Sequence, residues 1–276
     1  MPTRNDSRDL SHGVVVLTGA SAGIGREMAL QLAETGREGL RLTLAARDGG
    51  RLEEVAALCR ARGAQVLVVP TDVGVEGDCR RLIDRVVAAF GGIDTLLLNA
   101  GQDMGARFDE LADASVLERI VRINYLGPAW LTGAALPQLK TSRGRIVVVS
   151  SLAGLTGVPT RTGYAASKHA LHGFFDSLRI ELAGSGISVT LVCPDFVQSE
   201  IHRRALGPDG KAVGKSPLRE ERIMSASQCA RLILAAARAR RRMALLSLRG
   251  RLGRYVQVFA PGLIDRIAAR AVARGH

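Results

Sequence analysis

The fold is decided by one stretch near the N-terminus, Val14-Val15-Val16-Leu17-Thr18-Gly19-Ala20-Ser21-Ala22-Gly23-Ile24-Gly25. A short apolar run leads directly into a glycine-rich turn, and the turn leads into a segment of helical length at 24–35. Glycines at such a turn let the backbone bend tightly and approach a pyrophosphate, whose charge then faces the positive end of the following helix. Strand, glycine turn and helix in this order therefore predict a dinucleotide-binding site.

The same alternation of short apolar runs and longer amphipathic segments continues along the 276-residue chain. The runs are continuously apolar, which is typical of strands buried on both faces, and they cover 14–17, 42–46, 65–69, 95–98, 145–150, 188–193 and 243–247. Helices are expected at 24–35, 51–62, 76–90, 114–139, 163–182 and 226–241. Because no flexible linker divides the series, the pattern predicts a single-domain α/β Rossmann fold, a doubly wound seven-stranded parallel sheet with helices on both faces.

Composition excludes several other classes of protein. No apolar run approaches the roughly 20 residues that span a bilayer, and the polar segment 1–12 lacks the apolar stretch of a signal peptide. We therefore expect a soluble, cytoplasmic chain. Cysteines without the spacing of metal ligands, in a chain without a secretion signal, are expected to be reduced thiols; they are Cys59, Cys79, Cys193 and Cys229. Neither a metal site nor a disulfide framework is predicted.

The net charge of +12 raises the question of a nucleic-acid partner. Only four of the 38 basic residues are lysines, and the arginine excess beside abundant alanine and glycine is typical of a GC-rich coding bias. The sequence contains no helix-turn-helix, zinc-finger or aromatic RNA-binding signature. We expect no nucleic-acid partner.

The strongest chemical signal is Tyr164-Ala165-Ala166-Ser167-Lys168. Tyrosine and lysine four residues apart on a helix share one face, and a neighbouring cation favours the phenolate. Lys168 is therefore expected to lower the pKa of Tyr164, which can exchange a proton with a carbonyl or alcohol oxygen. The alternative is a core tyrosine beside a surface lysine. The scarcity of lysine, and the hydroxyls of Ser150 and Ser151 at the end of the preceding strand, favour catalysis.

Over about residues 13–247 the chain resembles the classical short-chain dehydrogenase/reductase family. The resemblance rests on the Thr-Gly-x-x-x-Gly-x-Gly spacing that begins at Thr18, on the Asn-Ala-Gly motif at 99–101 and on the Tyr-x-x-x-Lys pair. It implies a catalytic tetrad of Asn124, Ser151, Tyr164 and Lys168. In this scheme Ser151, thirteen residues before Tyr164, hydrogen-bonds the substrate oxygen, and Asn124 holds a water of the proton relay through Lys168. The spacing selects Ser151 over its neighbour Ser150.

The resemblance also implies which residues bind the cofactor. They are Gly19, Ser21, Ala22, Gly23, Ile24, Gly25, Arg47, Asp72, Val73, Asn99, Ala100, Gly101, Tyr164, Lys168, Pro194, Val197 and Ser199. Ala46 occupies the position of the acid that would hold the ribose 2′-hydroxyl of NAD, and Arg47 follows it. The missing acid predicts NADP, with Arg47 and Ser21 binding the 2′-phosphate. The alternative is that Arg47 is one of many surface arginines.

One position departs from the family pattern. After the sixth strand the family has Pro-Gly, whereas this chain has Pro194-Asp195. We expect Asp195 to sit in a left-handed turn and to change the local loop and the substrate pocket more than the chemistry. The segment 195–222, rich in proline and glycine, is expected to be the substrate loop within a Rossmann-fold oxidoreductase domain at 13–249.

A polar extension at 1–12 precedes this domain, and a basic amphipathic extension at 250–276 follows it. In the second extension Pro261 can begin a helix. Its apolar stripe comprises Leu263, Ile264, Ile267, Ala268 and Ala271, and its basic face comprises Arg266, Arg270 and Arg274. Such a helix can lie on an anionic membrane, making the protein peripheral to it. Because the stripe contains small alanines, we expect it to pack on its own subunit or a neighbour, near residues 196–220.

These features predict an NADP-dependent oxidoreductase that transfers a hydride between nicotinamide and a ketone, an aldehyde or a secondary alcohol. The Ala46-Arg47 pair and the basic C-terminus are similar to those of reductases of lipid-like and steroid-like ketones. Two alternatives remain: a ketoacyl-carrier reductase that receives an acidic carrier protein, and a non-catalytic NADP-binding sensor, which the retained tyrosine and lysine disfavour. The resemblance further implies a homodimer or homotetramer built on the helices that carry Asn124 and Tyr164.

Overall fold

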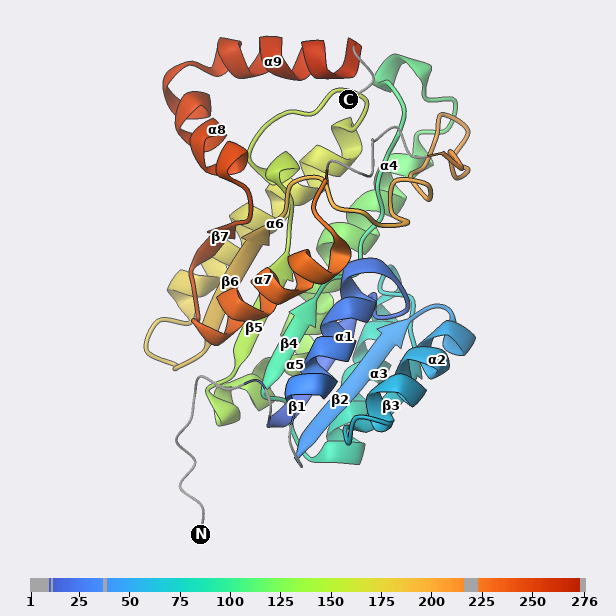
Figure 1. Ribbon diagram of the computed structural model, residues 1–276, viewed down its shortest axis with the longest axis vertical. Coiled ribbons are helices and arrows are strands. Elements are labelled where there is room, and N and C mark those ends of the chain that lie inside the picture. Colours follow the sequence, from blue (N-terminus) through green and yellow to red (C-terminus); the bar gives the residue numbers. More distant parts are fainter. Residues whose placement is uncertain (1–9, 11, 37–38, 216–222, 274–276) are drawn as a thin grey trace.

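The computed structural model describes residues 10, 12–36, 39–215 and 223–273, the last three without their side chains. A parallel seven-stranded sheet runs through the molecule in the order β3-β2-β1-β4-β5-β6-β7 (Figure 1). The strands are β1 (Gly13–Thr18), β2 (Leu40–Ala46), β3 (Gln65–Pro70), β4 (Thr95–Leu98), β5 (Arg145–Val149), β6 (Ser188–Cys193) and β7 (Met243–Leu245). The strand order reverses between β1 and β4, and in such sheets ligands bind outside the carboxyl ends of the strands at this point. The predicted fold class is confirmed.

Helices cover both faces of the sheet, as the alternation along β1 requires. Val15 and Leu17 belong to a core shared with α1 (Gly23–Thr35), α2 (Gly49–Arg60) and α7 (Ala226–Arg238). Val14 and Val16, on the opposite face, belong to a core shared with α3 (Glu76–Phe90), α5 (Gly127–Ser142) and α6 (Thr162–Glu181). Successive strand residues point to opposite faces, so a continuously apolar strand fills both cores at once.

The long helix expected at 114–139 is interrupted. It consists of α4 (Ser115–Val121), a π-helical turn η2 (Arg122–Leu126) and α5, which continues to Ser142. Asn124 lies in the middle of the π-helical turn and is buried. Such turns are frequent at functional sites because they reposition one side chain without ending the helix.

A third, smaller core joins the loops above the carboxyl ends of the strands. It includes Met104, Ile120, Tyr164 and Leu206. Backbone hydrogen bonds tie the expected substrate loop to the segment after β4: Gly105 N donates to Leu206 O at 2.9 Å, and Leu206 N donates to Asp103 O at 2.9 Å. Within its described part, the loop is therefore anchored beside Tyr164.

The C-terminal region differs from its prediction. The last strand stops at Leu245, because Ser247 caps a helix that the sequence analysis missed: its Oγ accepts a hydrogen bond from Gly250 N at 3.0 Å. This helix, α8 (Leu248–Phe259), is followed by α9 (Pro261–Ala273), which begins at the expected proline. Figure 1 shows both helices above the end of the sheet toward which the strands run.

Several expectations lie outside the described residues. They concern the extension at 1–9, the part of the substrate loop at 216–222, and Arg274. Two shorter helical turns complete the described chain, η1 (Phe108–Glu110) and η3 (Leu152–Gly154). No helix within the described ranges is long and apolar enough to cross a membrane.

Candidate active site

A cavity of about 1180 Å³ opens at the carboxyl ends of the strands. It exceeds the roughly 300–1,000 Å³ of a pocket for one small molecule, so it has room for a dinucleotide and a second ligand. Its wall runs from the glycine turn past Tyr164 to α8 and α9. Of the predicted site residues, all but Gly25 and Asn124 contribute to this wall.

The glycine turn is shaped to let a ligand approach the backbone. Gly19 has φ +67°, and a Cβ there would lie 2.9 Å from both Ala100 Cα and Asn99 Nδ2. Gly25 lies behind the turn, where a Cβ would lie 2.0 Å from Gly19 O, so its role is close packing of α1 against the turn. Asn99 braces the turn: its Nδ2 donates to Thr18 O at 3.1 Å and to Gly19 O at 3.3 Å.

The start of α1 has the donors that an anionic ligand needs. Its N-cap residue is Ala22, and no side chain caps the helix there. Ser21, Ala22, Gly23 and Ile24 line the cavity. The backbone N–H groups of the first helical turn, which have no side-chain partner, are therefore available to an anionic ligand. This arrangement fits the pyrophosphate of a dinucleotide.

The charged side chains at the ends of β2 and β3 differ in whether they have partners within the protein. Arg47 is exposed, lines the cavity, and makes no hydrogen bond or ion pair within the described part of the chain. Its neighbour Asp48 accepts from Arg51 N at 3.0 Å and caps α2. Asp72, also in the wall, is fixed by Gly74 N, which donates to its Oδ1 at 2.9 Å.

Ser151, Tyr164 and Lys168 meet in the middle of the cavity wall. Ser151 hydrogen-bonds the Tyr164 side chain, and its Oγ also accepts from Ala153 N at 3.2 Å. Lys168 Nζ donates to Val149 O at 3.0 Å and lies 5.6 Å from the centroid of the Tyr164 ring. Ser150 is engaged elsewhere, with its Oγ 3.0 Å from His172 Nε2. The structure thus places Ser151, and not Ser150, beside the tyrosine.

The electrostatics of this group differ from expectation. Burial and the nearby Asp103 carboxylate raise the pKa of Tyr164 above its ordinary value, and the Ser151 hydrogen bond and the Arg161 charge only partly oppose them. Burial also lowers the pKa of Lys168 to about 8. Lys168, whose amine donates to Val149 O, is not among the main influences on the pKa of Tyr164, so the structure does not support the expectation that it lowers that pKa. Tyr164 keeps its proton at neutral pH and is placed as an acid.

Residues 13–207 match the family model of the short chain dehydrogenases. The chain belongs to the short-chain dehydrogenase/reductase family of oxidoreductases. It is 36% identical over 258 residues to "Dehydrogenase/reductase SDR family protein 7-like" of Dictyostelium discoideum, which covers 91% of this chain and 79% of the relative. It is 37% identical over 235 residues to "11-beta-hydroxysteroid dehydrogenase 1A" of Arabidopsis thaliana, covering 83% of this chain and 66% of the relative, just under two thirds.

A solved family member is similar in structure as well. It is a short chain dehydrogenase/reductase from Burkholderia phymatum in complex with NAD. The two structures superpose with a TM-score of 0.79 at 28% sequence identity, over 91% of this chain and 95% of the other.

The side-chain amide of Asn124 is fully engaged within the protein, and its role in a proton relay stays a prediction. Its Nδ2 donates to Gln102 O at 2.9 Å and to Ser167 Oγ at 2.9 Å, and its Oδ1 accepts from Gln102 N at 2.8 Å. With these partners the amide locks the segment after β4 to α6. In this structure Asn124 positions the site from behind its wall.

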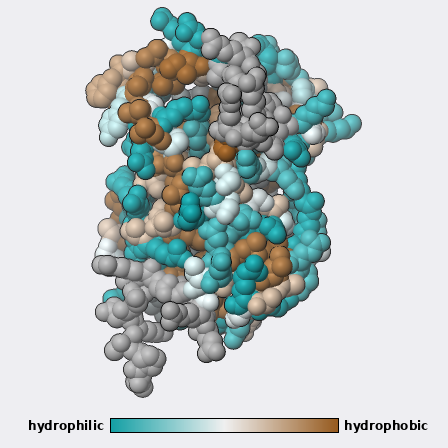
Figure 2. All heavy atoms as spheres, viewed as in Figure 1, coloured by the Kyte–Doolittle hydropathy of each residue, from teal (hydrophilic) through white to brown (hydrophobic). Residues whose placement is uncertain are grey.

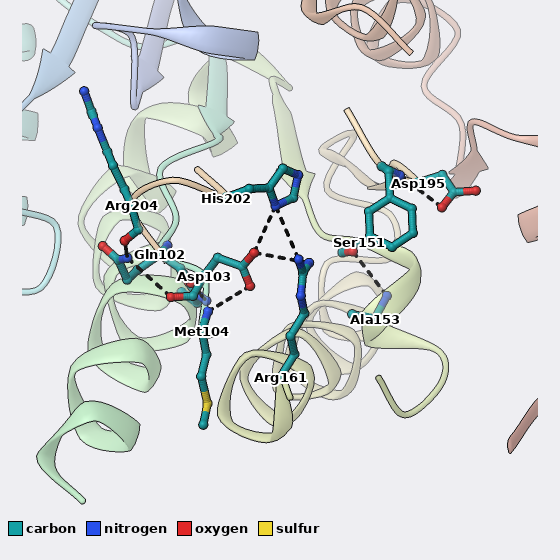
Figure 3. Close-up of polar contacts among 11 residues, drawn as sticks. Gln102, Asp103, Met104, Ser151, Ala153, Arg161, Asp195, His202 and Arg204 are labelled. Carbon is teal, nitrogen blue, oxygen red and sulfur yellow. Dashed lines mark hydrogen bonds and ion pairs between the residues drawn. The ribbon is translucent and has the colours of Figure 1, made fainter. Parts of the chain in front are cut away.

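Sequence reasoning missed a buried charged cluster beside Tyr164, formed by Asp103, Arg161 and His202 (Figure 3). Asp103 is 1% exposed; its Oδ2 lies 3.2 Å from Arg161 Nη1 and 3.1 Å from His202 Nδ1. Arg161 and His202 both line the cavity. Arg161 stands three residues before Tyr164, which is the one signal that the sequence offered for it.

Asp195 does not adopt the expected left-handed turn; among described residues other than glycine, only Arg143, Thr160 and Arg240 have positive φ. The Asp195 carboxylate is instead used for hydrogen bonds. Its oxygens accept from Arg249 Nη2 at 2.7 Å, Arg249 Nε at 3.1 Å, Ser247 Oγ at 3.0 Å and Phe196 N at 3.0 Å. The position that departs from the family pattern therefore ties α8 to the loop after β6.

Phe196 continues this link into the cavity. Two guanidinium groups lie near its ring, with Arg161 Cζ 5.7 Å and Arg249 Cζ 5.6 Å from the centroid. The charged cluster at Tyr164 and the first turn of α8 are thus joined through one aromatic ring. Arg161, Phe196 and Arg249 all line the cavity.

The cysteines lie outside this cluster. All four cysteines are free and buried, and burial raises the pKa of Cys59 to about 11 and those of Cys79, Cys193 and Cys229 to about 12. In the part of the chain that the structure describes, no group of three or more His, Cys, Asp or Glu side chains is arranged to hold a metal ion.

Proposed function

We propose that this chain is an NADP-dependent oxidoreductase that reduces a lipid-like ketone, or oxidises the corresponding secondary alcohol. The observation that carries the cofactor choice is the end of β2. Ala46 supplies no acid for a ribose 2′-hydroxyl, Arg47 is exposed in the cavity wall, and the nearby Asp48 is occupied as the cap of α2. An unpaired arginine suits a 2′-phosphate, and an NAD site needs an acid at this place.

The cofactor residues divide by the group that they hold. The N–H groups at the start of α1 would hold the pyrophosphate, and Arg47 with Ser21 would hold the 2′-phosphate. Asp72, Val73, Asn99, Ala100 and Gly101 would contact the adenosine, and Pro194, Val197 and Ser199 would contact the nicotinamide; all of them line the cavity. The solved relative contains NAD, so the choice between the two cofactors rests on Ala46 and Arg47.

The catalytic residues move the proton. The bound nicotinamide supplies or accepts the hydride. In reduction the Tyr164 hydroxyl donates its proton to the carbonyl oxygen, and Ser151 donates a hydrogen bond to the same oxygen. In oxidation the proton returns to Tyr164.

The substrate end of the cavity is largely apolar. Its wall includes aliphatic side chains from the segment after β5, from α8 and from α9: Leu152, Leu155, Val158, Leu252, Val256, Leu263, Ile264 and Ile267. Such a wall suits an aliphatic or polycyclic skeleton that carries one carbonyl. The relatives named as 11-beta-hydroxysteroid dehydrogenases support this substrate class.

The test is a cofactor and substrate screen on the purified chain. NADPH and NADH are titrated by fluorescence, and NADPH oxidation is followed with polycyclic ketones, long-chain ketones, short ketones and a ketoacyl thioester. We expect tighter binding of NADPH and the highest kcat/KM with a polycyclic or long-chain ketone. Preference for the thioester would favour a ketoacyl-carrier reductase. Cofactor binding without turnover on any carbonyl would favour a sensor.

A further inference from the structure

The two C-terminal helices expose an unusual share of the apolar surface. Of the twelve large hydrophobic side chains exposed among the described residues, seven lie between 248 and 267: Leu248, Leu252, Tyr255, Val258, Phe259, Leu263 and Ile267. Phe259 is 83% exposed and Val258 is 70% exposed. Figure 2 shows hydrophobic residues gathered over this end of the molecule. We call this surface the α8–α9 surface.

The charge of the same surface is one-sided. Between 248 and 270 the chain has five arginines and one acid, Asp265. Arg249 is paired with Asp195, whereas Arg266 and Arg270 have no ion-pair partner among the described residues. Apolar side chains mixed with surplus arginines suit a surface that is both apolar and negatively charged.

The cavity opens onto this surface. Leu252, Leu263 and Ile267 line the cavity and are also among the exposed hydrophobic side chains, at 59%, 50% and 53% exposure. They therefore frame the mouth through which the cavity meets solvent. A ligand dissolved in a lipid layer in contact with α8 and α9 would pass these side chains on its way to Tyr164.

We propose that the α8–α9 surface docks on an anionic lipid bilayer, so that the cavity mouth faces the membrane. The delivery of a lipid-dissolved substrate rests on the proposed function; the docking itself does not. A second copy of the chain fits this surface less well, because pairing two such surfaces would set the arginines of one copy against those of the other. The helices lie along the bilayer surface, with Tyr255 and Phe259 inserted among the headgroups.

The test is flotation of the full chain, without cofactor or substrate, on vesicles of phosphatidylcholine with and without phosphatidylserine. We expect the protein to float with the phosphatidylserine vesicles and to be released by high salt. Val258→Ser with Phe259→Ser should weaken this binding by about tenfold or more. Neither residue lines the cavity, so turnover of a water-soluble carbonyl should be unchanged.

Matched controls are available elsewhere on the chain. Phe108 is 64% exposed and Ile180 is 74% exposed, and both lie outside α8 and α9. Phe108→Ser with Ile180→Ser should float like the parent protein. Arg266→Gln should weaken binding, and Arg85→Gln on α3 should leave it unchanged. NADPH affinity checks that each variant is folded.

Three results would overturn the docking proposal: no flotation, equal binding to neutral and anionic vesicles, or equal losses in the control variants. Sedimentation velocity adds a fourth. If Val258→Ser with Phe259→Ser lowers the oligomeric state of a protein that does not float, the surface is an interface between copies. Flotation without turnover on any carbonyl would refute the proposed function and leave the docking intact.

Discussion

At Tyr164 the surroundings decide which form of the phenol enters the reaction. Burial and the Asp103 carboxylate raise its pKa, and Ser151 and Arg161 oppose them in part. Burial also lowers the pKa of Lys168, which lies on the same face of α6. The pair therefore rests as a neutral acid beside an amine that titrates near neutral pH, which differs from the ion pair that sequence spacing alone suggests.

The titration of Lys168 gives a prediction for stability. Its pKa in the folded chain is about 8, below the ordinary 10.5, so between these values the unfolded chain binds more protons. The free energy of unfolding should therefore rise with pH in this window, by on the order of 1 kcal/mol between pH 7 and 9. Lys168→Met should lack this contribution, measured by urea unfolding of the cofactor-free protein.

The pH dependence of the free energy of unfolding must be compared between variants, because the four buried cysteines lower this free energy as the pH rises. Their raised pKa values mean that the unfolded chain loses thiol protons first as the pH rises. Lys140→Met, at an exposed position on α5, serves as the control and should follow the parent protein. Parallel pH profiles for the parent and Lys168→Met would show that the buried amine has no depressed pKa.

Cofactor choice is also decided by single residues. Ala46→Asp combined with Arg47→Leu should replace a phosphate-binding site with a hydroxyl-binding site. Loss of the charge-assisted contact should weaken NADPH binding by about 1.5–3 kcal/mol and improve NADH binding. Arg85→Leu, an exposed arginine on α3, should change neither affinity. Equal catalytic efficiency with NADH and NADPH in the parent enzyme would contradict this assignment before any variant is made.

At the scale of elements, α6 and α8 both contribute to the cavity wall. Arg161 at the start of α6 and Arg249 in the first turn of α8 both lie near the ring of Phe196. Asp195 holds Arg249 through both carboxylate oxygens. One carboxylate in the loop after β6 therefore contacts both the cap and the first turn of α8.

Asp195→Asn should loosen α8. A partly exposed ion pair contributes about 1 kcal/mol at most, so we expect amide hydrogen exchange across 248–259 to accelerate by about fivefold. KM for the carbonyl substrate should rise more than the dissociation constant for NADPH, because most of the predicted cofactor residues lie on other elements. Asp209→Asn, at an exposed loop position, is the matched control. Unchanged exchange in α8 would mean that the ion pair does not hold the helix.

The elements themselves could largely be predicted, because local patterns determine them. Continuous apolar strands, the glycine turn and the proline that begins α9 are all visible within a few residues of sequence. The missed features depend on contacts between distant segments. Asp103, Arg161 and His202 meet across 58 and 99 residues, and Asp195 meets Arg249 across 54. The missed helix α8 has a local signal, its cap residue Ser247. The predicted last strand, 243–247, included this serine and so hid the signal.

At the scale of the whole molecule, we expect the cofactor and the substrate to be held by different parts of the chain. The predicted cofactor residues lie between 19 and 199, whereas α8 and α9 close the substrate end. The apolar stripe expected to pack on its own subunit does so only in part: Ile264 and Ala268 are half-buried, but Leu263 and Ile267 are about half exposed. We therefore expect the C-terminal helices to contact the substrate rather than the nucleotide.

Deletion of residues 262–276 tests this division. The truncated chain should bind NADPH with the affinity of the parent protein, because no predicted cofactor residue is removed. KM for a lipid-like ketone should rise, since Leu263, Ile264 and Ile267 leave the cavity wall. A short, water-soluble ketone provides the control and should be turned over as before. Loss of NADPH affinity would show that α9 belongs to the nucleotide site.

The most direct test of the central claim is the rate of NADPH-dependent ketone reduction by Tyr164→Phe. This substitution keeps the buried ring and removes the hydroxyl that donates the proton. We predict that kcat falls by about 10²-fold or more while the dissociation constant for NADPH stays within about twofold of the parent value. A variant that reduces the ketone at close to the parent rate would show that Tyr164 is not the proton donor and that the site works by another mechanism.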